Sequence, residues 1–385
     1  MLNDFLRKAA IKYSGKSSFE VPAEEQKGYI YKFREPRSYI ERSFFQYKAQ
    51  MRFKGFCGTF LINLASIPLF FTYFLKPSKR IKQKLNADAV FVKDNGVTNN
   101  ILPKSLFLEF DKLELNASEG NKLKIKDRLY VVKLLLRYPL SWHFALKSVI
   151  KIMRYRWLID LYKPKALIVH NEYSFTSSML TDFCNKNGVE LINVMHGEKL
   201  FNITDSFFKF NRCYIWDEFY RKLFCELRAA PDQFIVAIPP SMVFEKDDVP
   251  VNVDYTYYLQ AQTGNALASV IKLLVELRNK GFKVAIRPHP RFTNLNELRE
   301  ALINSDIEVE DCDNMNVKKS ILRTKNVVSV YSTVLQQAYY NKIGIVIDDV
   351  SNQERIRKLI EHQYIMLNVE HALLSDIMRA AEVNV

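Results

Sequence analysis

The sequence has little glycine and no regular cysteine spacing, and each shortage excludes a class of protein. Glycine makes up only 11 of the 385 residues, so we expect short loops between long helices and strands. The five cysteines are odd in number, and no two of them form a CxxC pair. This pattern excludes a disulfide framework and a CxxC zinc site, and it fits a reducing cytosol. The first 18 residues also lack the apolar stretch of a secretory signal.

Charge is plentiful, but it is distributed unevenly along the chain. Hydrophobic residues make up 48% and charged residues 25%, which is an ordinary globular composition. The net charge is +14, and residues 1–84 alone hold 17 Lys or Arg against 6 Asp or Glu. A basic chain can bind nucleic acid, an anionic membrane or a polyanionic substrate. The sequence contains no RNA- or DNA-binding motif, so we expect no nucleic-acid partner.

The basic region surrounds the most apolar stretch of the chain, residues 55–75, which contains no charged residue. Three interpretations stay open. The stretch is a monotopic helix in the cytoplasmic leaflet with Lys and Arg on the headgroups, a buried core helix, or a membrane span of about 20 residues. Asn63, Ser66 and Pro68 argue against a span. We expect a cytoplasmic protein that is peripheral on the inner membrane.

Strands and helices alternate through most of the chain. Residues 166–169 form an apolar strand, 175–187 a helix and 189–194 a second strand, and such a βαβ unit requires parallel pairing. The second half repeats this rhythm, with apolar runs that end near residues 259, 286, 330 and 347. The pattern predicts the α/β class, with two Rossmann-like domains built on parallel sheets.

These patterns divide the chain into five parts. Residues 1–84 form a basic, helical N-terminal region, and residues 85–228 form a Rossmann-like domain that binds the acceptor. Residues 229–253, with four prolines, form a linker. Residues 254–353 form the Rossmann-like nucleotide-sugar domain. Residues 354–385 form C-terminal helices that could cross back to the first domain.

Three loops of the second half predict a phosphate site, because ligands of open parallel sheets bind beyond the carboxyl ends of the strands. One loop precedes a helix whose free N–H groups suit phosphate. In another, two prolines fix the backbone around a histidine, and two arginines suit a diphosphate or a carboxylate. The third begins a helix, where its serine is either a phosphate ligand or an ordinary N-cap. The candidate residues are Gln262, Thr263, Gly264, Arg287, His289, Pro290, Arg291, Ser332 and Thr333.

The Arg-Pro-His-Pro motif, followed by Ser-Thr at a later helix start, resembles bacterial GT-B glycosyltransferases that build surface polysaccharide such as capsule or O-antigen. The resemblance covers residues 166–349 and is strongest to the bacterial sialyltransferases. Capsule Kdo transferases and polyol-phosphate transferases are more distant. It implies a GT-B-like fold in which two parallel sheets face a cleft. It also implies that His289 contacts the donor phosphate and assists departure of CMP, that Ser332 and Thr333 bind the same phosphate, and that no metal or other cofactor is needed.

The acidic pair followed by glycine, which supplies the general base in that family, has no counterpart in a suitable loop here. Glu172, in a strand-end loop of the first domain, is the first candidate for the base, with capping of the next helix as the alternative. His196, Glu198 and Asp205 are further candidates, either as the base or as acceptor ligands. A base must reach the acceptor hydroxyl within hydrogen-bond distance.

The expected function is inverting transfer of a sialic-acid-type sugar from its CMP donor to a saccharide acceptor, which we expect to be lipid-linked. Two alternatives stay open. The enzyme could use CMP-Kdo or another nucleotide sugar, or the protein could be a non-catalytic, membrane-associated component of polysaccharide assembly.

Overall fold

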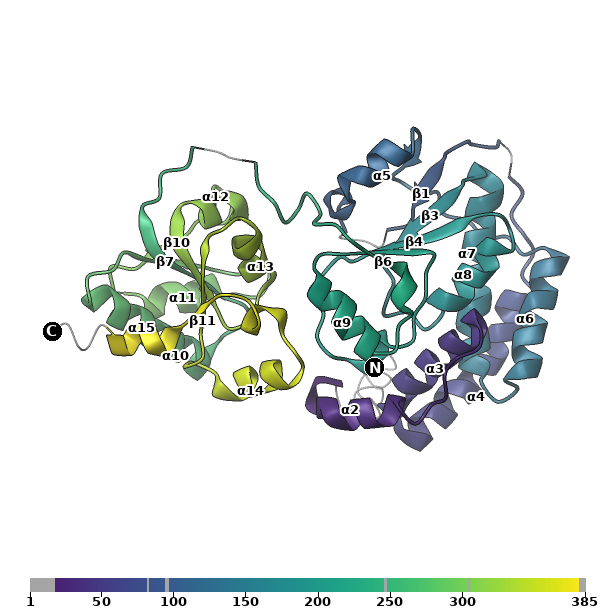
Figure 1. Cartoon of the computed structure of the whole chain (residues 1–385), viewed down its shortest axis with the longest axis horizontal. Coiled ribbons are helices and arrows are strands. Elements are labelled where there is room, and N and C mark those ends of the chain that lie inside the picture. The colour runs from purple at the N-terminus through teal and green to yellow at the C-terminus, as the bar shows by residue number, and fades with distance from the viewer. Residues whose placement is uncertain (1–17, 82, 94–96, 246–247, 304, 381–385) are drawn as a thin grey trace. The chain divides into compact units, whose positions relative to one another are not determined.

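The computed structural model describes residues 18–81, 83–93, 97–245, 248–303 and 305–380. The chain forms two compact units, Met1–Pro239 and Pro240–Val385, and each consists of a parallel sheet with helices on its faces (Figure 1). The prediction of two Rossmann-like domains is therefore confirmed, while the predicted cleft stays a prediction. The first 17 residues of the expected N-terminal region lie outside the described residues.

Unit 1 contains a six-stranded sheet in the order β2-β1-β3-β4-β5-β6, and every pair is parallel. The order reverses between β1 and β3, which makes the carboxyl ends of these strands the expected ligand edge. Helices on both faces bury β3 completely. The strands are β1 (Ala89–Phe91), β2 (Leu113–Glu114), β3 (Ala166–Val169), β4 (Glu190–Val194), β5 (Arg212–Ile215) and β6 (Phe234–Val236).

Helices α4, α6 and α8 pack against α7, which is 21 residues long and largely buried. Its Arg156 forms a buried ion pair with Asp127 of α6 at 2.8 Å. The helices are α2 (Ala23–Ile30), α3 (Tyr39–Arg52), α4 (Gly55–Phe74), α5 (Lys104–Glu109), α6 (Ile125–Arg137), α7 (Trp142–Tyr162), α8 (Ser177–Asn185) and α9 (Glu218–Glu226).

Helix α4 contains most of the apolar stretch found in the sequence. By length and composition it could cross a membrane, yet only 17% of its most apolar window is buried. Its buried residues are Gly58, Ser66 and Phe70, so the core-helix alternative is wrong. Asn63 and Ser66 of α4 face the rest of unit 1: Asn63 accepts a hydrogen bond from the backbone N–H of His143 at 3.0 Å, and Ser66 lies 3.3 Å from the His143 ring.

Two predicted boundaries of unit 1 differ from the structure. The basic N-terminal region is no separate part, because Ser43 of α3 accepts from the backbone N–H of Met179 and Gln46 donates to the backbone oxygen of Glu172. The predicted linker at 229–253 contains β6, which pairs with β5. The prolines that indicated a linker flank this edge strand, where missing N–H groups are tolerated.

Unit 2 contains a six-stranded parallel sheet in the order β12-β11-β10-β7-β8-β9. Counted along the unit, this is the order 6-5-4-1-2-3 of dinucleotide-binding folds, with the switch point between β7 and β10. The strands are β7 (Val253–Tyr258), β8 (Val284–Arg287), β9 (Glu308–Val309), β10 (Thr324–Ser329), β11 (Gly344–Ile347) and β12 (Ala372–Leu373). The helices are α10 (Gly264–Asn279), α11 (Leu295–Ala301), α12 (Val317–Leu322), α13 (Thr333–Tyr340), α14 (Gln353–Glu361) and α15 (Leu374–Ala380).

The C-terminal segment belongs to unit 2. Strand β12 pairs with β11, and Leu374 and Met378 of α15 join the apolar core of this unit. The apolar side of the segment thus belongs to the core of the second sheet, while the predicted crossing of residues 354–385 to the first domain stays a prediction.

Candidate functional site

A cavity of about 330 Å³ opens at the switch point of unit 2. Its wall combines the loop after β7, the first turn of α10, the end of β10 and the loop that leads into α14. Of the residues predicted for donor binding, only Gln262 lines this cavity. The lining residues are Gln260, Ala261, Gln262, Ala266, Val330, Ser351, Asn352 and Arg355.

Arg355 is the cationic residue of this wall. Its guanidinium lies 5.3 Å from the ring centre of Tyr331, and the backbone N–H of Arg355 donates to the Asn352 side chain at 2.9 Å. Ser351 is fixed by Asp348, whose carboxylate accepts from the backbone N–H of Ser351 at 2.9 Å. A half-buried guanidinium beside hydroxyl and amide groups suits a phosphate or carboxylate ligand.

The predicted phosphate site at the start of α10 is occupied by the protein itself. The N–H of Gly264 donates to a Glu297 carboxylate oxygen at 2.6 Å, so an acidic side chain already meets the positive end of the helix. Thr263 is the N-cap residue but makes no side-chain cap bond. In the structure Glu297 takes the place predicted for phosphate at Gly264, and phosphate binding there stays a prediction.

Arg287 has a structural role rather than the predicted ligand role. Its side chain is buried, pairs with Glu310 at 2.9 Å and donates to the backbone oxygen of Met315 at 2.8 Å. Arg323 pairs with the same carboxylate at 3.1 Å. The sequence could not show this, because Glu310 is distant in the chain from the Arg-Pro-His-Pro motif.

His289 follows β8 and is held in one orientation. Its Nδ1 accepts from the backbone N–H of Arg291 at 3.1 Å, and its ring stacks on Phe292 with centroids 4.6 Å apart. Partial burial and the Arg291 charge lower the pKa of His289. The neutral ring therefore carries its proton on Nε2 and presents a hydrogen-bond donor. Pro290 and Arg291 are exposed in the same turn.

Ser332 caps α13, because its hydroxyl oxygen accepts from the N–H of Val334 at 3.2 Å. This geometry matches the N-cap alternative. Thr333 is exposed in the first turn. Neither residue is among those that line the switch-point cavity, so phosphate binding by this pair stays a prediction.

In unit 1, ionisable side chains gather where β3 and β4 end. Glu172 and Lys199 form a buried pair at 2.5 Å, and Asn193 donates to the other Glu172 oxygen at 3.0 Å. His196 lies next to this pair, with Nδ1 at 3.8 Å from Glu172. The structure thus brings together residues that the sequence placed in separate loops. The strand-end cluster consists of His170, Glu172, His196, Glu198, Lys199 and Asp205.

Glu172 is poorly suited to act as the base. Burial alone would raise the pKa of its carboxyl, but Lys199 and His196 outweigh that effect and lower the pKa to about 2. Its side chain is only 1% exposed, so an acceptor hydroxyl has no access. The capping alternative is also wrong, because Thr176 occupies the N-cap of α8. Glu172 instead supplies a fixed negative charge beside His196.

His196 is a partly exposed titratable group of the strand-end cluster. Its side chain is 28% exposed, against 10% for Lys199. Its ring lies 4.6 Å from that of His170, in an edge-to-face arrangement. A histidine beside a buried carboxylate has the arrangement of a general base whose imidazolium form is stabilised by the acid.

Glu198 and Asp205 have shifted pKa values in the opposite direction from Glu172. Burial raises the pKa of Glu198 to about 8 and that of Asp205 to about 6. One Glu198 oxygen accepts from the Tyr220 hydroxyl at 3.0 Å. Active sites typically contain carboxyl groups whose surroundings shift their pKa values in opposite directions.

Lys199, His170 and Arg355 were not predicted from the sequence. Lys199 directly follows Glu198, and His170 lies two residues before Glu172. Arg355 belongs to the helix after the last apolar strand of the expected domain. The rule that ligands bind at strand ends would have included them, had it been applied to every strand.

No protein-family model matches the chain, and no curated protein matches it. Several solved structures resemble the chain at low identity. UDP-GlcNAc 2-epimerase from Neisseria meningitidis, bound to UDP-GlcNAc, is 11% identical, with 76% of this chain and 89% of that chain covered and a TM-score of 0.42. HepE from Anabaena in complex with UDP is 9% identical, with coverages of 77% and 90% and a TM-score of 0.43. The glycotransferase of kitacinnamycin is 10% identical, with coverages of 78% and 90% and a TM-score of 0.42. These values are too low to assign an activity.

Proposed function

We propose that the protein is an inverting glycosyltransferase that moves a sialic-acid-type sugar from a CMP donor to a saccharide acceptor in bacterial surface polysaccharide synthesis. One observation carries the proposal. Each unit places an oriented, partly exposed histidine beyond the carboxyl ends of its parallel strands, His196 in unit 1 and His289 in unit 2. Group transfer needs a base for the acceptor and a donor for the leaving group.

In this mechanism, His196 accepts the proton of the acceptor hydroxyl, and Glu172 stabilises the imidazolium that forms. The hydroxyl oxygen attacks the anomeric carbon while the bond from that carbon to the phosphate oxygen breaks, and CMP departs. The Nε2–H of His289 donates to the leaving phosphate. Arg355 binds the donor in the switch-point cavity, and Arg291 is available for the donor carboxylate.

The proposal needs no metal, because Arg355 supplies positive charge and the neutral His289 donates a hydrogen bond to the leaving phosphate. We further propose that the protein works at the cytoplasmic face of the inner membrane on a lipid-linked acceptor. The basic N-terminal part and the exposed apolar residues of α4 support this location.

A donor panel tests the function. The full chain is incubated with a saccharide acceptor and with CMP-sialic acid, CMP-Kdo or a UDP-sugar, with and without EDTA, and nucleotide release is measured. We expect CMP release from CMP-sialic acid that EDTA does not reduce. Turnover with CMP-Kdo alone would change the donor, and turnover with only a UDP-sugar would refute the CMP assignment. Absence of both turnover and binding for every donor would favour a non-catalytic assembly protein.

A further inference from the structure

Helix α4 presents on unit 1 an apolar face that the described residues leave exposed. Its opposite face is held by polar contacts, in which Asn63 bonds to Tyr47 at 3.1 Å and Ser66 lies 3.3 Å from His143. These contacts fix the helix against α3 and α7, so it lies along the unit. No charged residue interrupts the exposed face between Lys54 and Lys76. The exposed large apolar residues are Phe56, Phe60, Leu61, Leu64, Leu69, Phe71 and Leu75.

Helix α6 adds a second apolar stripe. Ile125, Leu129, Val132 and Leu136 follow one another at helical spacing, and their exposed fractions range from 36% to 79%. On its other face, α6 is anchored by the buried ion pair with α7. A solvent-facing stripe of this kind on an otherwise anchored helix marks an interaction surface.

The two helices meet at a basic junction. Arg128 of α6 lies 5.3 Å from the ring centre of Phe74 on α4 and donates to the backbone oxygen of Lys76 at 3.3 Å. The chain that leaves α4 and the chain that enters α6 both carry lysines here. The apolar faces of α4 and α6, together with this junction, are called the docking face below.

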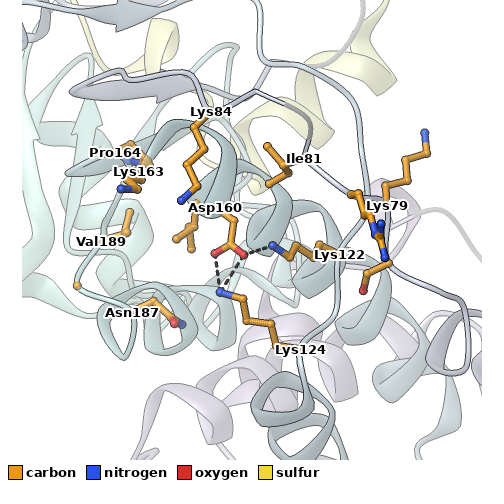
Figure 2. Close-up of a pocket in the computed structure, with 14 residues that line it drawn as sticks. Lys79, Ile81, Lys84, Lys122, Lys124, Asp160, Lys163, Pro164, Asn187 and Val189 are labelled. Atoms are coloured by element: carbon orange, nitrogen blue, oxygen red, sulfur yellow. Dashed lines mark hydrogen bonds and ion pairs between the residues drawn. The ribbon is translucent and has the colours of Figure 1, made fainter.

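A cavity of about 810 Å³ lies at this junction, on the amino-end side of β3 and β4 and therefore away from the strand-end cluster. Six cations line it against a single carboxylate. Asp160 lies between two of the lysines, at 2.6 Å from Lys122 and 2.8 Å from Lys124 (Figure 2). The six cations are Lys79, Arg80, Lys84, Lys122, Lys124 and Lys163.

A smaller cavity connects this basic region to the apolar helix. It has a volume of about 290 Å³, and its wall includes both Lys79 and Tyr73 of α4. Apolar groups and cationic groups therefore lie next to each other on this surface. The same order of apolar and charged layers occurs in a bilayer, where acyl chains adjoin anionic headgroups.

We propose that the docking face binds an anionic phospholipid bilayer, with α4 and α6 among the upper acyl chains and a headgroup phosphate in the basic cavity. The excess of five positive charges in the cavity favours an anionic bilayer over a second copy of this basic chain. The inference deepens the membrane location proposed above, and it does not depend on the transfer reaction.

Vesicle co-sedimentation of the full chain tests the proposal. Neutral phosphatidylcholine vesicles are compared with vesicles that contain 30% phosphatidylglycerol, and free pyrophosphate is added in a third arm. Each cation near an anionic surface contributes about fivefold in binding. Reversing three of them should therefore weaken binding to anionic vesicles by about 100-fold or more. The charge variant combines Lys79→Glu, Arg80→Glu and Lys84→Glu.

Three further variants, one test and two controls, separate apolar insertion from charge. Leu64→Glu with Leu129→Glu places charges on both stripes and should abolish binding to either vesicle. Leu108→Glu, at a position that is 85% exposed on α5, is the matched control and should bind like the parent. A charge control reverses three exposed cations of unit 2 and should also bind like the parent. These cations are Lys272, Arg299 and Arg357.

Three outcomes would overturn the proposal. Equal binding to neutral and anionic vesicles would remove the headgroup role of the cavity. Binding of free pyrophosphate by the parent that the charge variant loses, without binding of the parent to either kind of vesicle, would assign the cavity to a soluble phosphate ligand. The parent could instead form dimers and bind no vesicles, with Leu64→Glu converting the dimers to monomers. This result would assign the docking face to a second copy of the chain. Nucleotide release is measured separately, so failure of vesicle binding leaves the transfer reaction untouched.

Discussion

Replacing Glu198 with glutamine tests the electrostatics of the strand-end cluster most sharply. One carboxyl oxygen of Glu198 accepts from Tyr220, while the other is buried and has no hydrogen-bond partner among the described residues. Burial raises the pKa of Glu198 from 4.5 to about 8. The folded state thus keeps a proton that the unfolded state releases above pH 4.5, and stability is lost as pH rises toward 8.

The size of the effect follows from the pKa difference. A difference of one in pKa corresponds to about 1.4 kcal/mol. Ionisation of Glu198 therefore lowers the free energy of unfolding by about 4 kcal/mol at pH 8 and by about 1 kcal/mol at pH 5. Glutamine is neutral at both pH values and keeps an oxygen for Tyr220. We therefore expect Glu198→Gln to stabilise unit 1 by these amounts.

Urea unfolding followed by tryptophan fluorescence provides the assay. All three tryptophans, Trp142, Trp157 and Trp216, belong to unit 1, so the signal reports this unit alone. The control variant is Glu119→Gln, at an exposed position. Its effect on the free energy of unfolding should be the same at pH 5 and at pH 8. An equal stabilisation by Glu198→Gln at pH 5 and pH 8, or a loss of stability at pH 8, would refute the reasoning.

Three further predictions concern the two strand-end sites. Lys199→Met should lower the free energy of unfolding by about 3–5 kcal/mol, because it leaves the Glu172 carboxylate buried and unpaired. Adding Glu172→Gln should restore most of this free energy in urea unfolding. No recovery in the double variant would contradict the pairing of Glu172 with Lys199. Arg355→Ala should weaken calorimetric binding of a CMP-sugar by about 10- to 100-fold through loss of a charge-assisted hydrogen bond, whereas unchanged affinity would place the donor elsewhere. Arg291→Gln should raise the pKa of His289 in an NMR titration, and a lower value would contradict the assigned cause.

The regular elements could be predicted because their patterns are local. The apolar run of β3, the helix after it and Gly188 before β4 predict a parallel unit without any long-range information, and the structure contains it. Strands β9 and β12 contain only two residues each, too few for a periodic pattern. Strand β6 was hidden because prolines flank it.

The positions of the site residues in the fold could be predicted from the sequence, but their chemical roles could be predicted less well. The strand-end rule located His196, Glu172 and His289 correctly at the carboxyl ends of parallel strands. The roles of Glu172 and Arg287 depend on Lys199 and Glu310, which approach only in the folded chain. No sequence spacing shows which carboxylate is buried beside a lysine, and that burial decides between a base and a positioning residue.

The most direct test of the account compares the two histidines in one assay. The rate of transfer from CMP-sialic acid is measured in EDTA for the parent, His196→Gln and His289→Ala, together with calorimetric binding of CMP. We predict that each substitution lowers the rate by about 10²- to 10⁴-fold, and that His196→Gln leaves CMP binding unchanged. A parental rate in either variant would contradict the assignment of one catalytic histidine to each unit.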